Sequence, residues 1–539
     1  MIEHAWLIVF GLSLLGGILS GIPVMLVLAG VPVLLAFIAA PFGGFDLSYL
    51  QAYPQRAFGV MSNSLLLAVP LFVLMGILLE KSRVAERMLM QVGRLLGGSP
   101  RALVAAVLMI STLIAASTGI IGATIVMLGL ISLPAMRRVG VPDGTASGLI
   151  CAAGTLGQII PPSIVLILLG DQVANAYLDA QQRAGNFAPD AVTVGDLFAG
   201  ALLPGLVLVA LYGVYAVGIL WKHEAPASSE PMPDSSLADV LREIVPPILL
   251  ILSVLGSVLA GVATPTEAAA IGVAGTILIT AARVRAAGDD EVMPGVVPEA
   301  ALTQRLTPAW LRIAMSLTAA VGFGLVALRL AGVGRVDLSA ATVAMGPGAM
   351  LALGLTVLLV LGLVIAVIAL WRAGVMAAAL YETVKVSAMI FGIILAASML
   401  SLVFRGFEGD VWVHEMLTGL PGDHRTMLLI TLAIIFVMGF VLEFVEIVFI
   451  VVPLVGPIIL QDVDPVWFAV LIALNLQTSF LTPPFGFALF YYRSVAPADI
   501  STGAIYRSVI PFVLIQLVTL AIVFLWPDLA TWLPDMLFG

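Results

Sequence analysis

The chain has 539 residues, of which 61% are hydrophobic and only 10% are charged. A soluble domain ordinarily carries about 25% charged residues, so this composition excludes a water-soluble fold. The net charge of −9, without a basic stripe interleaved with aromatic residues, argues against nucleic-acid binding. The single cysteine, Cys151, excludes a disulfide framework and a cysteine-ligated zinc site.

Apolar runs long enough to cross a bilayer, roughly 20 residues each, recur on the order of a dozen times along the chain. We therefore predict an all-α polytopic membrane protein. The first forty residues are interrupted at Gly21-Ile22-Pro23 and at Pro32, which fits either two short helices or one kinked helix. The N-terminus is acidic and has no small-residue cleavage site, so we expect no removable signal peptide.

Loop charges predict how the spans are oriented. Residues 80–101 contain the basic residues Lys81, Arg83, Arg87, Arg94 and Arg101, which indicate a cytoplasmic loop. By contrast, residues 171–196 contain four aspartates and only one basic residue, Arg183, which predicts a periplasmic loop.

The apolar region between these loops, residues 102–170, contains many helix breakers: Ser117-Thr118-Gly119, Gly122, Pro134, Gly154, Gly157 and Pro161-Pro162. Breakers at membrane depth free backbone groups that lipid cannot satisfy, so they are tolerated only where the backbone is buried or lines a cavity. We predict a hairpin that enters from the cytoplasm and turns near residues 118–122, with two half-helices between Ser117 and Met136. A broken helix follows, whose second half has proline near its first turn.

A similar arrangement returns near the C-terminus. Residues 475–486 place small polar residues before Pro483-Pro484 inside an apolar span, and Gly439 to Pro457 form a proline-bounded hairpin candidate. The charge after this copy is reversed, because Arg493 and Arg507 mark a cytoplasmic loop where the first copy ends in an acidic one. This pattern is typical of an inverted repeat with binding sites formed by broken helices at the membrane midplane.

Neutral oxygen atoms near these breaks are suited to sodium. A hard cation takes several oxygen ligands, which unwound backbone and Ser, Thr, Asn or Gln side chains supply. One candidate set is Thr118, Gly119, Gly154, Thr155 and Gly157, and a second is Asn475, Gln477, Thr478 and Thr482. The N-termini of the half-helices would suit a substrate carboxylate. The alternative is that these small residues only permit close helix packing.

Two acidic residues, Glu443 and Glu446, lie in the second hairpin region. A charge at membrane depth costs at least ~2.5 kcal/mol and usually has a function, which here would be cation binding or coupling. Alternatively, both lie near the membrane surface at the hairpin tip or contact another subunit. We do not expect an enzyme, because the chain has neither a Gly-x-x-x-x-Gly-Lys loop nor a His-Glu-x-x-His motif.

Five strings, in order along most of the chain, resemble the large (M, DctM-like) membrane subunit of tripartite ATP-independent periplasmic (TRAP) transporters. They are PLFVLMG at 70–76, AASTGIIGAT at 115–124, GTLGQIIPPS at 154–163, ATPTEAAA at 263–270 and LTPPFG at 481–486. The resemblance implies an elevator-type subunit of the bacterial inner membrane with two re-entrant helical hairpins. It also implies Na⁺ as coupling ion, a small four-helix membrane partner and a periplasmic substrate-binding protein. The implied substrate is a small carboxylate, such as a 2-oxo or hydroxy acid or a C4-dicarboxylate.

By position, the resemblance places the first hairpin tip at Ser117 to Thr124 and the second at Gly439 to Glu446. The breaks at Gly154 to Gly157 and Asn475 to Thr482 would complete the two sodium sites. The implied sodium ligands then also include Ser117, Gly122, Gly439 and Glu443, and the implied substrate residues are Thr124, Pro161, Pro162, Ser163, Glu446, Pro483 and Pro484.

Two departures from the family pattern stand out. Many members have Asp where Glu443 stands and another Asp near Thr124. In addition, two extra apolar stretches, Leu317 to Leu330 and Leu351 to Leu370, replace what the resemblance implies is a short connector.

The expected organisation has eight parts: N-terminal scaffold helices (1–101), first hairpin and broken helix (102–170), periplasmic loop and span (171–222), connecting scaffold helices (223–283), an insert with two extra hydrophobic segments (284–375), scaffold helices (376–433), second hairpin and broken helix (434–492) and a C-terminal span (493–539). Two other functions are open at this point. One is a stand-alone sodium/dicarboxylate symporter that needs no binding protein, and the other is a membrane scaffold subunit that does not transport.

Overall fold

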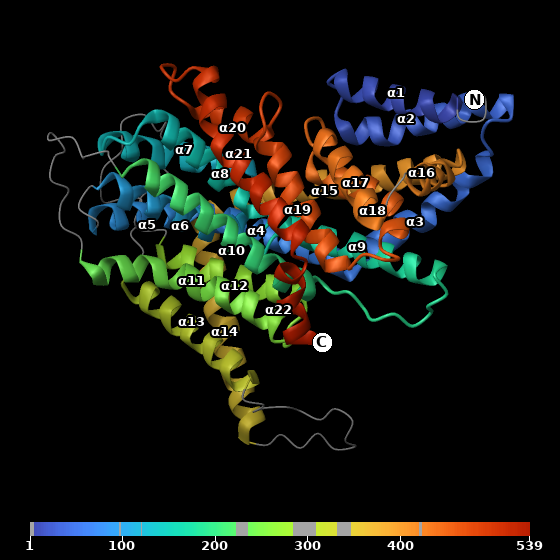
Figure 1. Cartoon of the computed structure of the whole chain (residues 1–539). Helices are drawn as coiled ribbons and strands as arrows, with labels where there is room; N and C mark the ends of the chain where they lie inside the picture. The colour runs from blue at the N-terminus through green and yellow to red at the C-terminus, as the bar shows by residue number, and fades with distance from the viewer. Residues whose placement is uncertain are drawn as a thin grey trace.

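The structure is a computed structural model that describes residues 5–95, 99–119, 121–221, 236–283, 309–330, 347–419 and 423–539. Within these ranges every regular element is a helix (Figure 1), and ten helices are long and apolar enough to cross a membrane. The predicted all-α polytopic membrane fold is confirmed.

The N-terminal apolar stretch forms two helices, α1 (Ala5–Leu19) and α2 (Val24–Ala39), rather than one kinked helix. The chain turns between them at Gly21, whose φ of 78° is the left-handed conformation that glycine adopts without strain. Three 3₁₀ turns and three helices follow: η1 (Ala40–Phe42), η2 (Leu47–Ala52), α3 (Tyr53–Ser62), η3 (Ser64–Leu67), α4 (Ala68–Lys81) and α5 (Val84–Leu95). The predicted cytoplasmic loop at 80–101 therefore contains a helix, α5.

The same order of elements then occurs twice: a helical hairpin, a broken helix and a long span. The first set is α6 (Pro100–Thr118), α7 (Ile121–Arg138), α8 (Asp143–Thr155), η4 (Leu156–Gln158), α9 (Ile164–Arg183) and α10 (Val194–Ile219). The second set is α17 (His424–Met438), α18 (Phe444–Ile459), α19 (Pro465–Leu481), α20 (Phe487–Val495) and α21 (Thr502–Leu525).

The arms of both hairpins differ from the prediction. Residues 121–138 form one continuous helix, α7, so two half-helices between Ser117 and Met136 are wrong, and the other arm is α6. The turn lies at Gly119, whose φ of 60° ends α6. Likewise, most of the stretch from Gly439 to Pro457 belongs to the single helix α18, and the other arm is α17. Glycines at the turns separate the two arms of each hairpin. The prolines inside α7 and α18, by contrast, do not interrupt those helices.

The acidic loop is shorter than predicted, because Asp171 belongs to α9 rather than to the loop. This side chain is only 8% exposed, and its two carboxylate oxygens accept hydrogen bonds from Asn63 Nδ2 at 2.7 Å and Gln172 Nε2 at 2.8 Å. Two amide donors thus satisfy a carboxylate that would otherwise be costly to bury. The segment between α9 and α10 comprises residues 184–193.

The remaining helices connect or flank the two sets. They are α11 (Leu237–Leu259), α12 (Pro265–Arg283), α13 (Ala309–Leu330), α14 (Pro347–Arg372), α15 (Val375–Gly406), α16 (Gly409–Thr418) and α22 (Asp528–Phe538). The extra apolar stretches are the helices α13 and α14, which pack on each other and on α12. Figure 1 shows this pair extending away from the rest of the molecule. The long helix α15 packs against α2 and α4, where Lys81 Nζ lies 2.9 Å from Glu382 Oε1.

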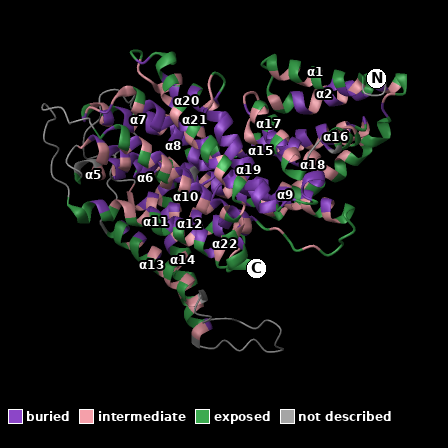
Figure 2. Ribbon diagram, in the orientation of Figure 1, coloured by how far each residue is buried: buried purple, intermediate pink, exposed green. Residues whose placement is uncertain are grey.

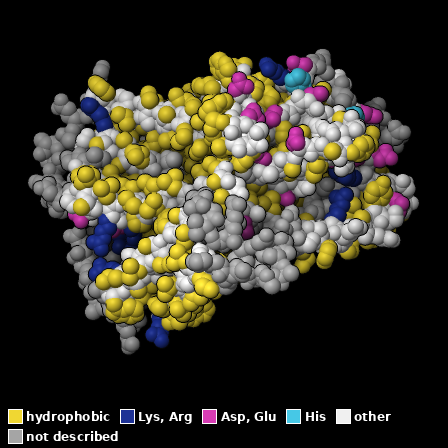
Figure 3. Space-filling model, turned by 90° about the horizontal axis from the view of Figure 1, so that it is seen from below, with side chains coloured by type: hydrophobic (Ala, Val, Ile, Leu, Met, Phe, Trp, Pro, Cys, Tyr) yellow, Lys and Arg dark blue, Asp and Glu magenta, His cyan; other side chains and the backbone are white. Residues whose placement is uncertain are grey.

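The core of the molecule contains the two broken helices. All 17 residues of α19 are buried, and so is every residue from Ala146 to Gly170. Figure 2 shows this concentration of buried residues at the centre, while α13 and α14 are largely exposed or intermediate. Hydrophobic side chains also cover much of the described surface on one face of the molecule (Figure 3), as expected of a surface that meets lipid. The first break and the helix before the second break are thus shielded from that surface, whereas Pro484 and Phe485 of the second break are exposed.

Candidate functional site

Both broken helices are interrupted at their Pro-Pro pairs. The first break runs from Ile159 to Ser163 and the second from Thr482 to Gly486, and in each the Pro-Pro peptide bond is cis. The prolines of the first break directly precede Ser163 and so lie near the first turn of α9, as predicted. Ser163 is the N-cap of α9, because its Oγ accepts a hydrogen bond of 3.2 Å from Val165 N. Ser163 Oγ also donates a hydrogen bond of 3.1 Å to the Gln158 carbonyl. This candidate substrate residue therefore links the two ends of the break.

The turn of the first hairpin lies directly against the first break. A Cβ added at Gly157 would lie 3.0 Å from the Ala115 carbonyl oxygen, and one at Gly119 would lie 3.3 Å from Ile164 N. Gly154 in turn lies against the side chain of Ile125 in α7. The structure therefore brings Gly119 and Gly157 together, while Gly154 contacts the other arm of the same hairpin; a sodium site at these residues stays a prediction. The side chains of Ser117 and Thr118 lie outside the described part of the chain.

The second hairpin packs in the same way on α19. Gly439 lies against the Ser479 side chain so closely that no Cβ would fit without movement. One of its arms, α17, also receives a hydrogen bond of 2.7 Å, from Asn475 Nδ2 to the Leu432 carbonyl. Gly439 and Asn475, which the sequence assigned to one site, are thus both at the contact between this hairpin and α19.

The two sets of elements also interlock. The arm α7 of the first hairpin packs against α20, and the arm α18 of the second hairpin packs against α9. A Cβ added at Gly122 would lie 2.8 Å from the ring of Tyr491 in α20, so glycine is what allows this approach. Each hairpin is therefore held by the second half of the other set's broken helix.

Buried polar side chains meet where the first halves of the broken helices cross. Thr155 Oγ1 accepts from Gln477 Nε2 at 3.2 Å and from Gln516 Nε2 at 3.4 Å, and it donates to the Ala152 carbonyl at 2.8 Å. The structure thus joins Thr155 and Gln477, which came from different predicted sets. Sequence reasoning missed Gln516, although a glutamine within the apolar span α21 was a usable signal.

The hydroxyl hydrogens of two other candidates are used within their own helix. Thr478 Oγ1 donates to the Leu474 carbonyl at 2.8 Å, and Thr482 Oγ1 donates to the Thr478 carbonyl at 2.7 Å. Their oxygen lone pairs remain as potential cation ligands. Of the candidate substrate residues, Thr124 is buried in α7, whereas Pro484 is exposed at the second break.

Glu443 and Glu446 lie at the turn of the second hairpin, where α18 begins. Glu446 is only 2% exposed, and its Oε2 accepts a hydrogen bond of 2.7 Å from the Glu443 backbone N–H. A carboxylate at this end of a helix is stabilised by the backbone N–H groups and the helix dipole. Glu443 is thus the N-cap of α18, and Glu446, three residues into the helix, belongs to a capping box with it. No group of three or more His, Cys, Asp or Glu suited to a metal occurs among the described residues, so a cation here would rely largely on neutral oxygens.

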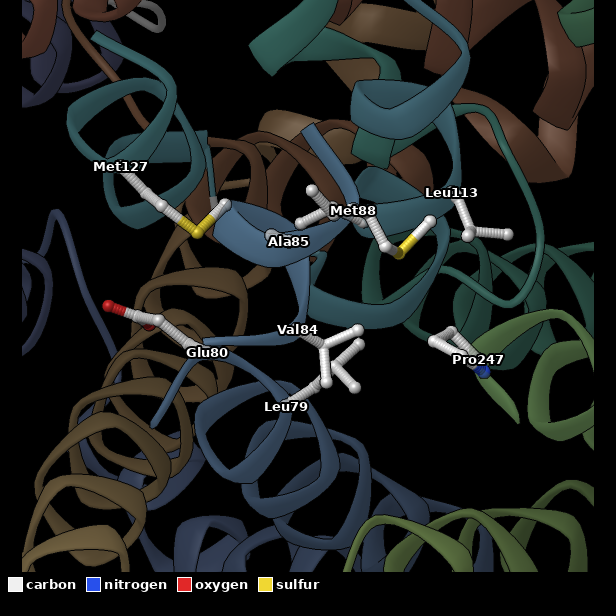
Figure 4. A pocket seen from close by; sticks show the side chains of 9 residues that line it. Leu79, Glu80, Val84, Ala85, Met88, Leu113, Met127 and Pro247 are labelled. Carbon is white, nitrogen blue, oxygen red and sulfur yellow. The ribbon is translucent and has the colours of Figure 1, made fainter. Parts of the chain in front are cut away.

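An apolar pocket lies elsewhere, among α4, α5, α6, α7 and α11 (Figure 4). It is lined by Leu79, Glu80, Val84, Ala85, Met88, Leu113, Ile114, Met127 and Pro247. In Figure 4 the Glu80 carboxylate points away from Leu79 and Val84, at the edge of the group. Because the pocket contains none of the predicted site residues and offers almost no polar group, it does not suit a small carboxylate.

Comparison with known proteins places nearly all of the chain in one family. The model of the "Tripartite ATP-independent periplasmic transporter, DctM component" family matches residues 10–373 and 363–529. The C4-dicarboxylate TRAP transporter large permease protein DctM of Vibrio cholerae is 26% identical over 484 residues, which cover 88% of this chain and 86% of that protein. The sialic acid TRAP transporter large permease protein SiaM of the same organism is 24% identical and covers 90% of each chain.

A solved structure supports the fold. The YdaH transporter of Alcanivorax borkumensis superposes with a TM-score of 0.53 at 14% identity, over 91% of this chain and 89% of that one. At this identity the likeness concerns the fold alone. Since the family model covers nearly all of the sequence, this chain is a multi-pass inner-membrane transport protein, not an enzyme, and belongs to the DctM component family of tripartite ATP-independent periplasmic transporters.

Proposed function

We propose that this chain imports a small organic acid together with sodium ions, and that a periplasmic binding protein delivers the acid. A small four-helix membrane subunit completes the transporter. The family assignment supports transport, and the relatives named for C4-dicarboxylate and sialic acid support a small carboxylate as substrate. The strings at 115–124 and 481–486 favour a 2-oxo or hydroxy acid within that class.

The observation that carries the proposal is the packing of each hairpin turn on a break or on the helix before it. Gly119 and Gly157 make this contact in the first set, and Gly439 and Ser479 make it in the second. Helix ends that meet at such places expose backbone N–H and C=O groups whose partial charges suit a carboxylate and a cation, respectively. One sodium ion that moves inward down ~100 mV contributes about 2.3 kcal/mol before its concentration term.

The interlocked packing supports an elevator movement. The hairpins and broken helices hold one another through the α7–α20 and α9–α18 contacts, so they would move as one body. The helices α2, α4, α12 and α15 are joined by the α2–α15, α4–α15 and α4–α12 contacts and would form the fixed scaffold, to which α13 and α14 add. In this arrangement both hairpins are re-entrant, entering and leaving the membrane on the same side.

Uptake into proteoliposomes tests the proposal. Vesicles that contain the full-length chain would receive radiolabelled C4-dicarboxylates, 2-oxo acids and hydroxy acids with an inward sodium gradient, with and without the small subunit and the binding protein. We expect uptake only when both partners and sodium are present. Uptake by the chain alone would contradict the proposal and show that the chain is a stand-alone symporter. If no acid were taken up although every component was verified as folded, the chain would instead be a scaffold subunit that does not transport.

A further inference from the structure

Four polar side chains form a buried cluster at the crossing of the two sets of elements. They are Thr155 of α8, Tyr212 of α10, Gln477 of α19 and Gln516 of α21, and each is 0% exposed. The Tyr212 hydroxyl lies beside Gln516, Gln477 and Thr155. Tyr212 and Gln516 belong to neither the hairpins nor the broken helices, so the cluster extends beyond the site described above.

The hydrogen bonds of this cluster leave oxygen atoms without a partner. The Thr155 hydroxyl gives its proton to Ala152, and both glutamine amides direct an N–H group to Thr155 Oγ1. Among the residues that the structure describes, Gln477 Oε1, Gln516 Oε1 and the Tyr212 hydroxyl have no partner with good hydrogen-bond geometry. Buried polar atoms are nearly always satisfied in folded proteins, so three such oxygens in one cluster indicate a bound species that accepts their lone pairs.

We propose that this cluster binds a sodium ion through Gln477 Oε1, Gln516 Oε1 and Tyr212 Oη, while Thr155 Oγ1 orients the two glutamine amides by accepting an N–H group from each. Neutral oxygens suit a monovalent cation in a membrane interior, because side-chain dipoles replace its hydration shell without a buried negative charge. The inference rests on the proposed sodium coupling and adds to it a site separate from the hairpin turns. Because its ligands come from α10 in the first set of elements and from α19 and α21 in the second, an ion here would connect the two halves of the protein.

Sodium binding by the purified full-length chain tests this site. ²²Na⁺ binding would be measured at constant ionic strength with K⁺ as the replacing ion, for the wild type and for Tyr212→Phe and Gln516→Leu. Tyr492→Phe is the matched control, because this buried tyrosine hydroxyl is already paired with Ser147 Oγ at 2.7 Å. We expect each cluster variant to bind one sodium ion fewer per chain, or to bind that ion at least about tenfold more weakly. The control should match the wild type.

The outcomes separate this site from the proposed function. Wild-type sodium number and affinity in both cluster variants would overturn the site and leave water as the occupant of the cluster. If the wild type itself bound no sodium, the proposed sodium coupling would fall as well. Each variant is first checked for an unchanged elution profile and melting temperature in K⁺. Should Gln516→Leu fail this check, Tyr212→Phe decides, because it removes a single oxygen and keeps the ring.

Discussion

Thr155 and Gln477 are 322 positions apart in the sequence, yet Gln477 Nε2 lies 3.2 Å from Thr155 Oγ1. This hydrogen bond joins the first halves of the two broken helices inside the core. Gln516 of α21 donates to the same oxygen at 3.4 Å, so one threonine hydroxyl connects three helices. The two sets of elements are thus joined by polar contacts in the core, where α8, α19 and α21 meet.

Thr155→Val should destabilise the folded chain, because it leaves two buried amides without their acceptor. We expect a loss of about 1–3 kcal/mol in the free energy of unfolding, seen as a lower melting temperature in detergent. Thr519→Val is the control, since this buried hydroxyl donates only to the Ile515 carbonyl of its own helix, at 2.9 Å. Equal melting temperatures for the two variants would show that the Thr155 contacts contribute nothing beyond local helix bonding.

Gly157→Ala should impair transport by pushing the first hairpin away from the break. The new Cβ would meet the Ala115 carbonyl at 3.0 Å, and overpacking of this kind typically costs about 1–3 kcal/mol. Gly256→Ala in the span α11 is the control, because no atom lies within 4 Å of the Cβ position there. Uptake by equal amounts of membrane-inserted protein measures both. Wild-type uptake by Gly157→Ala would mean that the hairpin turn does not need its close contact.

Gly439→Ala should have a similar effect on the second hairpin, and a change in its partner should reverse it. The added Cβ collides with the Ser479 side chain, so Gly439→Ala combined with Ser479→Gly should recover part of the lost uptake. A double-mutant cycle on uptake and melting temperature separates this coupling from the cost of each single change. Strictly additive effects would contradict direct packing between the two residues.

Single cysteines should report the orientation of the spans. The native Cys151 is fully buried, so it should stay unlabelled by a membrane-impermeant maleimide and needs no replacement. We expect Asp190→Cys, in the exposed segment between α9 and α10, to be labelled from the periplasm in intact spheroplasts. Ala498→Cys, exposed after α20, should be labelled only after permeabilisation. The reverse pattern, or labelling of both in intact cells, would refute the proposed inverted arrangement.

Sequence reasoning located the breaks but misplaced parts of the elements around them. Glycine and paired proline act locally, so the hairpin turn near Gly119 and the break at Pro161-Pro162 were predictable. Helix ends were less predictable, because α9 continues to Arg183 through a stretch that the charge pattern assigned to an acidic loop, and Asp171 within it is buried and accepts a hydrogen bond from Asn63. That hydrogen bond joins residues 108 positions apart, and no local pattern records it.

The sequence by itself determined the membrane class, the number and order of the breaks and the family, because hydropathy, helix breakers and ordered strings depend only on neighbouring residues. Only the tertiary structure decided which polar residues share a site. It joined Thr155 to Gln477 and added Tyr212 and Gln516, which belong to no motif that the sequence pattern singled out. The physical reason is that a buried polar group is satisfied by whichever chain segment packs against it, and that packing follows from how all the helices assemble.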